Sequence, residues 1–206
     1  MGERGRELVI ETATAACSVA LVEDGVVLAA IHEVVGRGHA ERLVPMIAEL
    51  PEGGRADAIR VDCGPGSFTG VRVGLAAARA LGLGWDVPVT GFSSLALIAA
   101  DVADPPAELA VAIGGGHGEL FVQRFATAPL APIDAMTSLK PEAAAAAIPD
   151  AIVVGSGAEA LVSARGSGEA RAAEAKAANF VRLPAALTGL PPSPLYGRAP
   201  DARPPG

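Results

Sequence analysis

The sequence predicts a duplicated α/β domain with a mixed sheet, because strand-forming runs alternate with helical patterns and the arrangement occurs twice. Residues 7–22 read as a strand, a turn of small residues and a second strand, and residues 108–125 repeat this layout in weaker form. In each half, hairpin-rich strands are followed by an α-β-α series. A doubly wound Rossmann layout fits less well, since a hairpin and not a helix joins the first strands.

The first lobe is expected to cover residues 1–103. Asp24-Gly25 joins two β-rich runs and is a strong hairpin signal. Pro45 would kink its helix unless it lay in the first turns, and Ser93 is the expected N-cap of the last helix. The expected elements are strands at 7–12, 17–23, 26–34, 57–63 and 88–92, and helices at 39–50, 67–84 and 94–102.

The second, smaller lobe is expected to cover residues 104–206, after a linker at Asp104-Pro105-Pro106. A strand, a Gly-rich turn and a strand are expected within 108–125, and another strand and Gly-rich turn within 151–157. Residues 163–178 are poor in large apolar groups and read as a solvated helix or a mobile segment. The Pro-rich C-terminal tail is expected to be extended.

Composition and charge narrow the class of protein. Half of the 206 residues are hydrophobic and 19% are charged, which is typical of a globular chain long enough to bury a core. The net charge of −7, with Arg and Lys scattered singly, disfavours tight binding of RNA by this chain alone. Two cysteines, no signal-peptide pattern and no apolar run of about 18 residues predict a cytoplasmic protein with reduced thiols and no membrane span.

The stretch "GPGSFTG" at residues 64–70 stands between a strand and a helix, where backbone N–H groups can hold an anion. The Lys and Ser/Thr of a phosphate loop are missing, because Val71 and Arg72 follow Gly70. The stretch also differs from the G-x-S-x-G of a nucleophile elbow, and no histidine is spaced as a triad base for Ser67. A dedicated nucleotide site and a serine nucleophile are both disfavoured.

Glycines recur in the helix that follows, as part of a stripe of small residues. Gly70, Gly74, Ala77 and Leu81 share one face. Because glycine costs a helix interior roughly 0.5–1 kcal/mol relative to alanine, close contact with this face is expected to offset the cost. Two alternatives stay open: the face packs on the chain's own sheet, or it admits a helix of a partner.

The sequence offers few residues that could bind a metal ion or act as a general acid or base. His32, His39 and His117 form neither H-x-x-x-H nor H-E-x-x-H, so each is expected to be a surface residue. Glu11 ends the first strand with no paired carboxylate evident near it, and capping or surface exposure is its expected role. The sequence predicts no catalytic residue and no metal site.

Five segments carry a family resemblance, and they occur in the order "LVIETATAACSVALVEDG", "GHAERLVPMIAEL", "GPGSFTGVRVGLAAARAL", "VPVTGFSSLALIA" and "PLYGRAPDARP". Together they resemble the TsaB (YeaZ) family of threonylcarbamoyladenosine synthesis on tRNA, also labelled glycoprotease-like or M22. The resemblance is dense from about Glu7 to Ala100, thinner over 108–125, and returns in the tail.

The resemblance implies an actin/Hsp70-like fold (ASKHA, RNase H-like) with two duplicated lobes. It implies a subunit without catalysis of its own, which scaffolds the catalytic paralogue TsaD and works with the ATPase TsaE. That complex adds threonylcarbamoyl to N6 of the adenosine beside the anticodon in tRNAs that read ANN codons. The implied partners are TsaD, TsaE, tRNA through the complex only, and a second copy when the chain is alone. Peptidase activity is rejected, because the metal-ligating histidines of the catalytic paralogue are missing.

The implied partner surface is the helix pair at 39–50 and 67–83, which would form a four-helix bundle with the same pair of a partner. Its expected residues are His39, Arg42, Leu43, Met46, Ile47, Leu50, Phe68, Thr69, Gly70, Arg72, Val73, Gly74, Ala77 and Leu81. No cofactor is expected for the isolated chain, and ATP or ADP at a subunit interface stays open. The weak candidates for holding it are Glu11, Thr12, Gly64, Gly66 and Ser67.

Two departures from the family pattern weaken a nucleotide site. Where the family has Asp-Thr-Ser after the first strand, this chain has Glu11-Thr12-Ala13, and Gly114 replaces an Asp at the matching strand of the second lobe. Actin-like sites use these positions to hold phosphate and Mg²⁺, so ATP hydrolysis by this chain alone is disfavoured. An independent ATPase of the actin/Hsp70 type is kept as the alternative function, and a direct tRNA-binding module as a weaker one.

Overall fold

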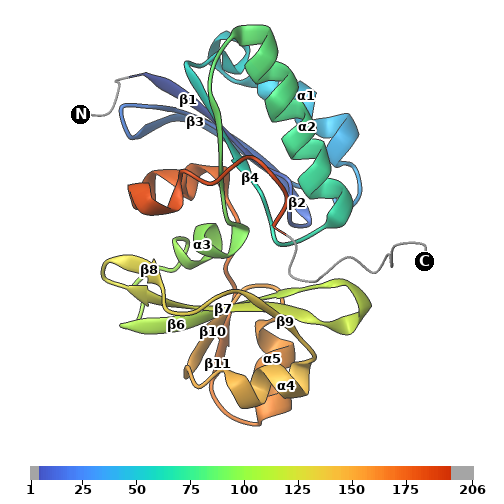
Figure 1. Cartoon of the computed structure of the whole chain (residues 1–206), viewed down its shortest axis with the longest axis vertical. Helices are drawn as coiled ribbons and strands as arrows, with labels where there is room; N and C mark the ends of the chain where they lie inside the picture. The colour runs from blue at the N-terminus through green and yellow to red at the C-terminus, as the bar shows by residue number, and fades with distance from the viewer. Residues whose placement is uncertain (1–4, 196–206) are drawn as a thin grey trace, which may run out of the picture.

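The computed structural model describes residues 5–195, which form two α/β lobes stacked along the long axis of the molecule (Figure 1). Each lobe is built on one sheet, with strand order β3-β2-β1-β4-β5 in the first and β8-β7-β6-β10-β11 in the second, where β9 also pairs with β7. In both sheets the lobe's first strand is central, antiparallel to the next strand and parallel to a later one. The predicted duplicated fold with mixed sheets is confirmed.

The elements of the first lobe agree with the predicted order. They are β1 (Arg6–Glu11), β2 (Ala16–Glu23), β3 (Val26–Val34), α1 (His39–Glu49), the 3-10 turn η1 (Pro51–Gly54), β4 (Ala58–Asp62), α2 (Phe68–Trp85), β5 (Val89–Phe92) and α3 (Ser94–Ala99). Asp24 and Gly25 both have positive φ, at 52° and 79°, which suits the tight turn predicted between β2 and β3. Pro45 lies inside α1 rather than in its first turn, and its side chain is exposed.

The second lobe has shorter helices. Its elements are β6 (Glu108–Gly114), η2 (Gly116–Gly118), β7 (Leu120–Thr127), β8 (Leu130–Pro132), β9 (Thr137–Leu139), α4 (Pro141–Ala147), β10 (Ile152–Val154), α5 (Ala158–Arg165) and β11 (Glu169–Arg171). Two further 3-10 turns follow, η3 (Ala177–Arg182) and η4 (Ala185–Leu187).

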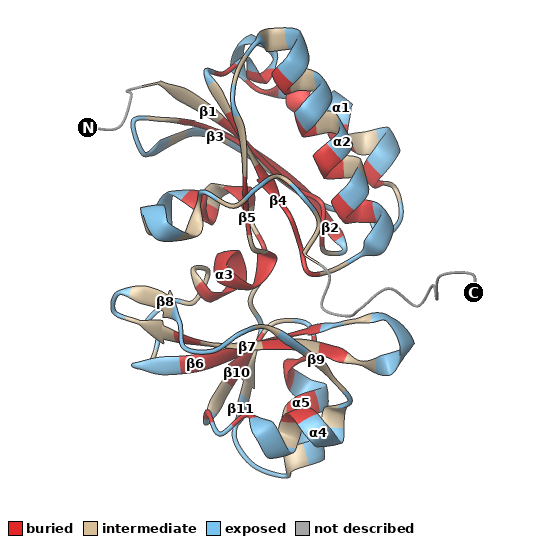
Figure 2. Ribbon diagram, in the orientation of Figure 1, coloured by how far each residue is buried: buried red, intermediate tan, exposed pale blue. Residues whose placement is uncertain are grey.

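Helices cover the outer face of each sheet, and α3 fills the space between the two sheets (Figure 2). On the first sheet, α1 and α2 cover a core that includes Leu8, Ile10 and Ile59. On the second sheet, α4 and α5 cover a smaller core. The core around α3 takes side chains from both sheets, among them Val9 and Val111. The lobes therefore share a hydrophobic core.

The chain after β11 returns to the first lobe. η3 packs on β2 and β3, and Leu190 pairs with Gly91 of β5. The reading of residues 163–178 as a solvated helix or mobile segment is wrong: α5 ends at Arg165, β11 forms an edge strand, and Ala175 is buried in the core around α3. Small side chains are needed there because two sheets and a helix approach one another.

The helix expected at 94–102 is shorter, because the chain after Ala99 holds the returning segment. Asp101 accepts hydrogen bonds from the Glu174 N–H at 3.0 Å and from Asn179 Nδ2 at 2.8 Å. No helix within residues 5–195 is long and apolar enough to cross a membrane.

Candidate functional site

The "GPGSFTG" loop joins β4 to α2 and packs tightly on the turn after β1. The Ser67 hydroxyl accepts a hydrogen bond from the Gly70 N–H at 3.2 Å and so caps the first turn of α2. Thr12 Oγ1 donates to the Gly70 carbonyl at 2.7 Å. A Cβ on Gly66, whose φ is +159°, would lie 2.1 Å from the Ala13 carbonyl oxygen. These glycines are required because two backbone segments touch.

The glycine face of α2 is directed at the chain's own sheet. A Cβ on Gly70 would lie 2.0 Å from the Thr12 carbonyl oxygen, and one on Gly74 would lie 2.4 Å from Thr12 Oγ1. Of the two alternatives that the sequence left open, packing on the chain's own sheet is correct for both glycines. Their assignment to a partner surface is therefore wrong.

Burial divides the predicted partner surface. His39, Leu43, Met46, Ile47 and Leu50 are at most 4% exposed, so assigning them to a partner surface is also wrong. The four apolar side chains contact the sheet beneath α1. Accessible members of the set are Arg42, Phe68, Thr69, Arg72, Val73, Ala77 and Leu81, and their contact with a partner stays a prediction.

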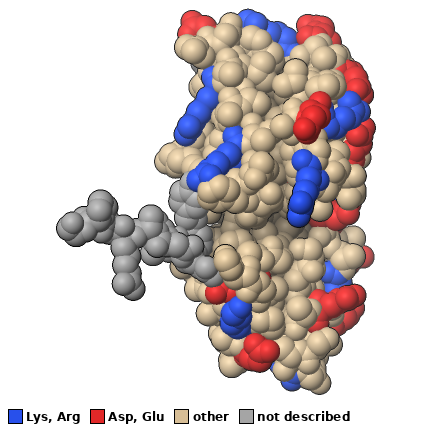
Figure 3. Space-filling view, turned by 90° about the vertical axis from the view of Figure 1, so that its right-hand side faces the viewer, with Lys and Arg blue, Asp and Glu red and all other residues tan. Residues whose placement is uncertain are grey.

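Three large apolar side chains of α1 and α2 are exposed, and one of them, Phe68, also lines the cavity between the lobes. Val44 is 61% exposed, Phe68 is 63% exposed and Leu83 is 87% exposed. The Arg72 guanidinium lies over the Phe68 ring, 3.3 Å from its centroid. Sequence reasoning missed Val44 and Leu83. Val44 lies off the buried face of α1, and Leu83 lies off the buried face of α2. Figure 3 views the side that carries these helices, and Lys and Arg are spread singly over it.

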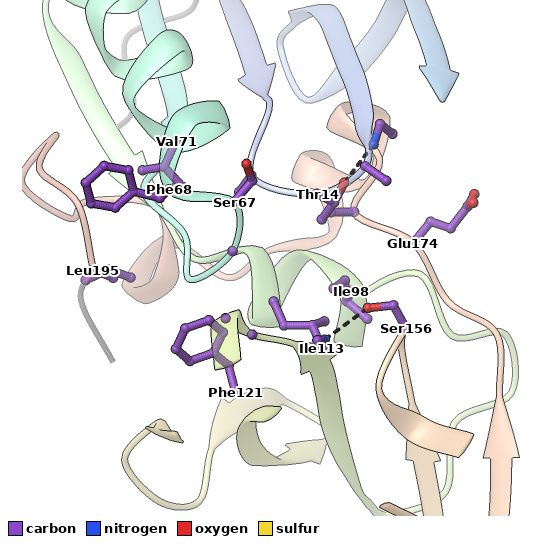
Figure 4. A pocket seen from close by; sticks show the side chains of 18 of the residues that line it. Thr14, Ser67, Phe68, Val71, Ile98, Ile113, Phe121, Ser156, Glu174 and Leu195 are labelled. Carbon is purple, nitrogen blue, oxygen red and sulfur yellow. Dashed lines mark hydrogen bonds between the residues drawn. The ribbon is translucent and has the colours of Figure 1, made fainter. Parts of the chain in front are cut away.

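A cavity of about 910 Å³ lies between the lobes. Its first-lobe wall consists of residues 13–16 and the start of α2, and its second-lobe wall includes the glycine-rich turn 114–117 (Figure 4). Phe68 and Phe121 lie on opposite walls, with Leu195 near them. Most of the lining is apolar.

Of the five residues suggested for holding a nucleotide, two line this cavity. Gly66 and Ser67 line it, whereas Glu11, Thr12 and Gly64 are buried behind its wall. Gly114 ends β6 on the opposite wall, and its N–H donates to Ser156 Oγ at 3.2 Å. The second-lobe contribution, Ser156 included, was not found from the sequence.

Glu11 is part of a buried carboxyl pair that the sequence did not predict. It is fully buried, and so is Asp62 at the end of the adjacent parallel strand β4. Burial, and then the charge of Asp62, raise the pKa of Glu11 well above its usual range. Burial likewise raises the pKa of Asp62. Surface exposure and the lack of a carboxylate partner are therefore wrong for Glu11, whereas its side chain does cap the turn by accepting from the Thr14 N–H at 2.9 Å.

The histidines are not grouped with other metal-binding side chains. His39 is buried, contrary to expectation, and its Nε2 lies 2.9 Å from the Thr14 carbonyl and 3.1 Å from the Ala16 carbonyl. It therefore ties α1 to the turn after β1. Among residues 5–195, no three His, Cys, Asp or Glu side chains are placed to hold a metal ion together.

The two lobes of one strand order, their shared core and the cavity between them define a duplicated two-lobe α/β protein with mixed sheets. The family model "TsaD: tRNA N6-adenosine threonylcarbamoyltransferase" matches residues 30–135. The fold is similar to that of YeaZ from Pseudomonas aeruginosa, with a TM-score of 0.78, 29% identity, and coverage of 93% of this chain and 99% of that one. The chain belongs to the TsaB/YeaZ family and shares with TsaD the region that the model matches.

The chain is also similar to two curated proteins, of which the first carries the TsaB name. The Escherichia coli "tRNA threonylcarbamoyladenosine biosynthesis protein TsaB" is 44% identical over 99 residues, which cover 46% of this chain and 42% of that protein. The chain therefore matches less than half the length of this relative. An uncharacterized protein of Mycobacterium tuberculosis is 34% identical over 212 residues, covering 96% of this chain and 93% of the relative.

Proposed function

We propose that this chain is a non-catalytic subunit in the synthesis of threonylcarbamoyladenosine on tRNA, and that it supports the catalytic paralogue TsaD. The observation that carries this proposal is the apolar outer surface of α1 and α2. Val44 and Leu83 expose large apolar groups there, and exposed apolar surface is a feature of protein–protein contact sites. The name of the Escherichia coli relative supports the pathway.

The outer surface suits a helix pair as its partner. Ala40, Val44 and Ala48 follow one another at four-residue intervals on α1, and all are exposed. On α2, Ala76 and Ala80 are exposed with the same spacing. Small and medium side chains in i, i+4 rows form shallow ridges that pack into the grooves of another helix pair. The same surface would pair two copies of the chain when TsaD is absent.

An ATPase of the actin/Hsp70 type is the second candidate, and the interlobe cavity is the observation that favours it. Gly66 and Ser67 would face a ligand there. Glu11 and Thr12 would not, because both are buried behind the wall. ATP or ADP bound between the lobes is therefore a proposal that rests on the cavity alone, and nucleotide between subunits has no observation of its own.

TsaE and tRNA would join through the complex. The chain carries 16 Lys and Arg against 23 Asp and Glu, and its basic side chains are spread singly over the face in Figure 3. Such a surface gives little attraction to a phosphate backbone. Contact with tRNA is therefore assigned to the partner subunits.

The experiment that tests the proposal compares variants in a binding assay with TsaD. Val44→Glu and Leu83→Glu place a charge on the outer surface without touching the core, so both should weaken the complex at least tenfold. Val26→Glu is the matched control, because Val26 is 63% exposed on β3 and lies away from these helices. Calorimetry measures the affinity for TsaD, and the mass in solution shows whether the complex or the dimer has formed.

Formation of threonylcarbamoyladenosine by the reconstituted proteins gives the functional readout. The same two variants should lower it in proportion to lost binding, and Val26→Glu should leave it intact. Normal binding by both Glu variants, with normal folding, would show that the outer surface of α1 and α2 is not the contact site.

A further inference from the structure

We propose that Glu11 and Asp62 form a buried proton-binding site that retains one proton in the folded protein at neutral pH. The site lies at the ends of β1 and β4, beneath the two first-lobe loops that line the cavity. It is independent of the proposed role in tRNA modification.

Strand register places the two carboxyl groups side by side. Ile10 is opposite Val61 in the parallel β1–β4 pair, so Glu11 and Asp62 come next along the two strands. Neighbouring residues of paired strands point to the same face of the sheet, with Cβ atoms about 5 Å apart. Both residues are 0% exposed. Two negative charges cannot both be retained at this separation away from water without a large free-energy cost.

The hydrogen bonds indicate where the proton resides. Glu11 Oε1 accepts from the Thr14 N–H at 2.9 Å, and Glu11 Oε2 accepts from the Thr14 hydroxyl at 3.3 Å. Asp62 Oδ1 accepts from the Gly64 N–H at 2.6 Å. Asp62 Oδ2 is buried and has no hydrogen-bond partner. A proton on Oδ2 converts this unpartnered acceptor into a donor.

The groups around the pair supply no positive charge to it. Glu11 lies beside Ser18 of β2, Asp62 lies beside Phe92 of β5, and Ser94 of α3 faces Asp62. Cys17 and Cys63 are neutral thiols, because burial raises the pKa of each to about 11.

The basic side chains on the elements around the pair have other partners. His32 of β3 lies opposite Ser18, and its Nε2 is 3.6 Å from Glu174 Oε2. Arg60, two residues before Asp62, binds Glu7 and Thr90. In the returning segment, Lys176 pairs with Asp101 and Glu174. Among the residues that the structure describes, no Lys, Arg or His forms an ion pair with Glu11 or Asp62, so a proton is left as the neutralising group.

The retained proton holds two loops together. Glu11 binds the turn at Thr14, and Asp62 binds the "GPGSFTG" loop at Gly64. Thr14, Gly66 and Ser67 from these loops line the cavity. Loss of the proton would create repulsion directly beneath them, so the cavity wall is coupled to pH.

Chemical unfolding between pH 5.5 and 8.5 tests the proposal. The unfolded chain releases a proton that the folded chain keeps, so stability falls as pH rises. For each unit by which the pH rises, release of one proton should raise the unfolding equilibrium constant of the wild type about tenfold. The double variant Glu11→Gln/Asp62→Asn cannot bind this proton and should not show that rise. The matched control is Asp150→Asn, because Asp150 is also buried but pairs with Arg124 at 2.7 Å. Unlike the double variant, Asp150→Asn should not become more stable relative to the wild type as the pH rises.

Infrared spectroscopy of the wild type at pH 7 gives a readout that needs no stable variant. A protonated-carboxyl band is expected there, because both carboxyl groups are fully buried. The band should disappear when the wild type is unfolded at the same pH. Absence of the band from the wild type would overturn the proposal, and so would parallel unfolding curves for the wild type and the double variant. Selective stabilisation of the wild type at pH 8 by Na⁺, K⁺ or Mg²⁺ would instead show that the pair holds a metal cation.

Discussion

The two lobes share one strand order but differ in the helices that cover them. α1 and α2 have 11 and 18 residues, whereas α4 and α5 have 7 and 8. The first-lobe helices also carry the exposed Val44, Phe68 and Leu83, and the second-lobe helices carry no exposed large apolar side chain in the part of the chain that the structure describes. The lobes thus agree in the topology of their sheets and differ in the length and outer-face composition of their helices.

The lobes also treat buried acids differently. In the second lobe, Asp150 is neutralised by Arg124. In the first, Glu11 has only Asp62 beside it and no cationic partner among the described residues. A buried charge needs either a counter-ion or a proton, and each lobe illustrates one of these solutions.

The largest expected loss of stability comes from substitutions that create a small void in the core of each lobe. Leu43→Ala in α1 and Leu161→Ala in α5 each remove a side chain that is at most 1% exposed, so each should cost about 2–5 kcal/mol of unfolding free energy. Because the core around α3 joins the lobes, both variants should unfold in one transition, measured by urea denaturation with fluorescence and circular dichroism.

The control for this pair is Val44→Ala, next to Leu43 but 61% exposed, which should change stability by less than about 0.5 kcal/mol. Separate transitions for the lobes in either core variant would break the comparison, since they would show that the shared core does not couple the lobes.

A smaller effect distinguishes the two faces of α2. Gly74→Ala places a Cβ 2.4 Å from Thr12 Oγ1 and should cost about 1–3 kcal/mol. Gly84→Ala is the matched variant in the same helix, where a Cβ meets nothing within 4 Å, and it should stabilise by about 0.5–1 kcal/mol. Thermal unfolding measures both. Equal effects would contradict the inward direction of the Gly74 face.

The smallest expected effect concerns the cap of α2. Ser67→Ala removes the acceptor of the Gly70 N–H and should lower stability by about 1 kcal/mol. Ser67→Asp keeps an acceptor at this helix N-terminus and serves as the control. If Ser67→Ala is as stable as the wild type, the hydroxyl is not needed to start the helix.

Local signals in the sequence predicted the elements well. Asp24-Gly25 marked the hairpin, Ser67 and Ser93 marked helix starts, and the repeat of strand, turn and strand predicted two lobes. Each of these features depends on a few consecutive residues or on a periodicity. Such patterns are set by backbone conformation and by which side chains share a face.

Contacts between distant segments could not be predicted in this way. Glu11 and Asp62 meet only because β1 and β4 pair, and Gly70 and Gly74 pack on Thr12 only because α2 crosses β1. Periodicity identified the bare face of α2 but not the surface that covers it. The segment at 163–178 was misread because its small side chains resemble solvated sequence when the surrounding sheets are not known.

The return of the chain after β11 has a consequence for synthesis on the ribosome. Phe180 lies against Phe92, with ring centroids 5.3 Å apart, and both belong to the core around α3. When residues up to 103 have been synthesised, the strands of the first sheet and α3 are present. The second sheet and the Phe180 ring, which cover them in the folded protein, are not yet present. A nascent first lobe therefore keeps an open apolar face until Phe180 has been synthesised, and transiently exposed apolar surface of this kind favours non-native association.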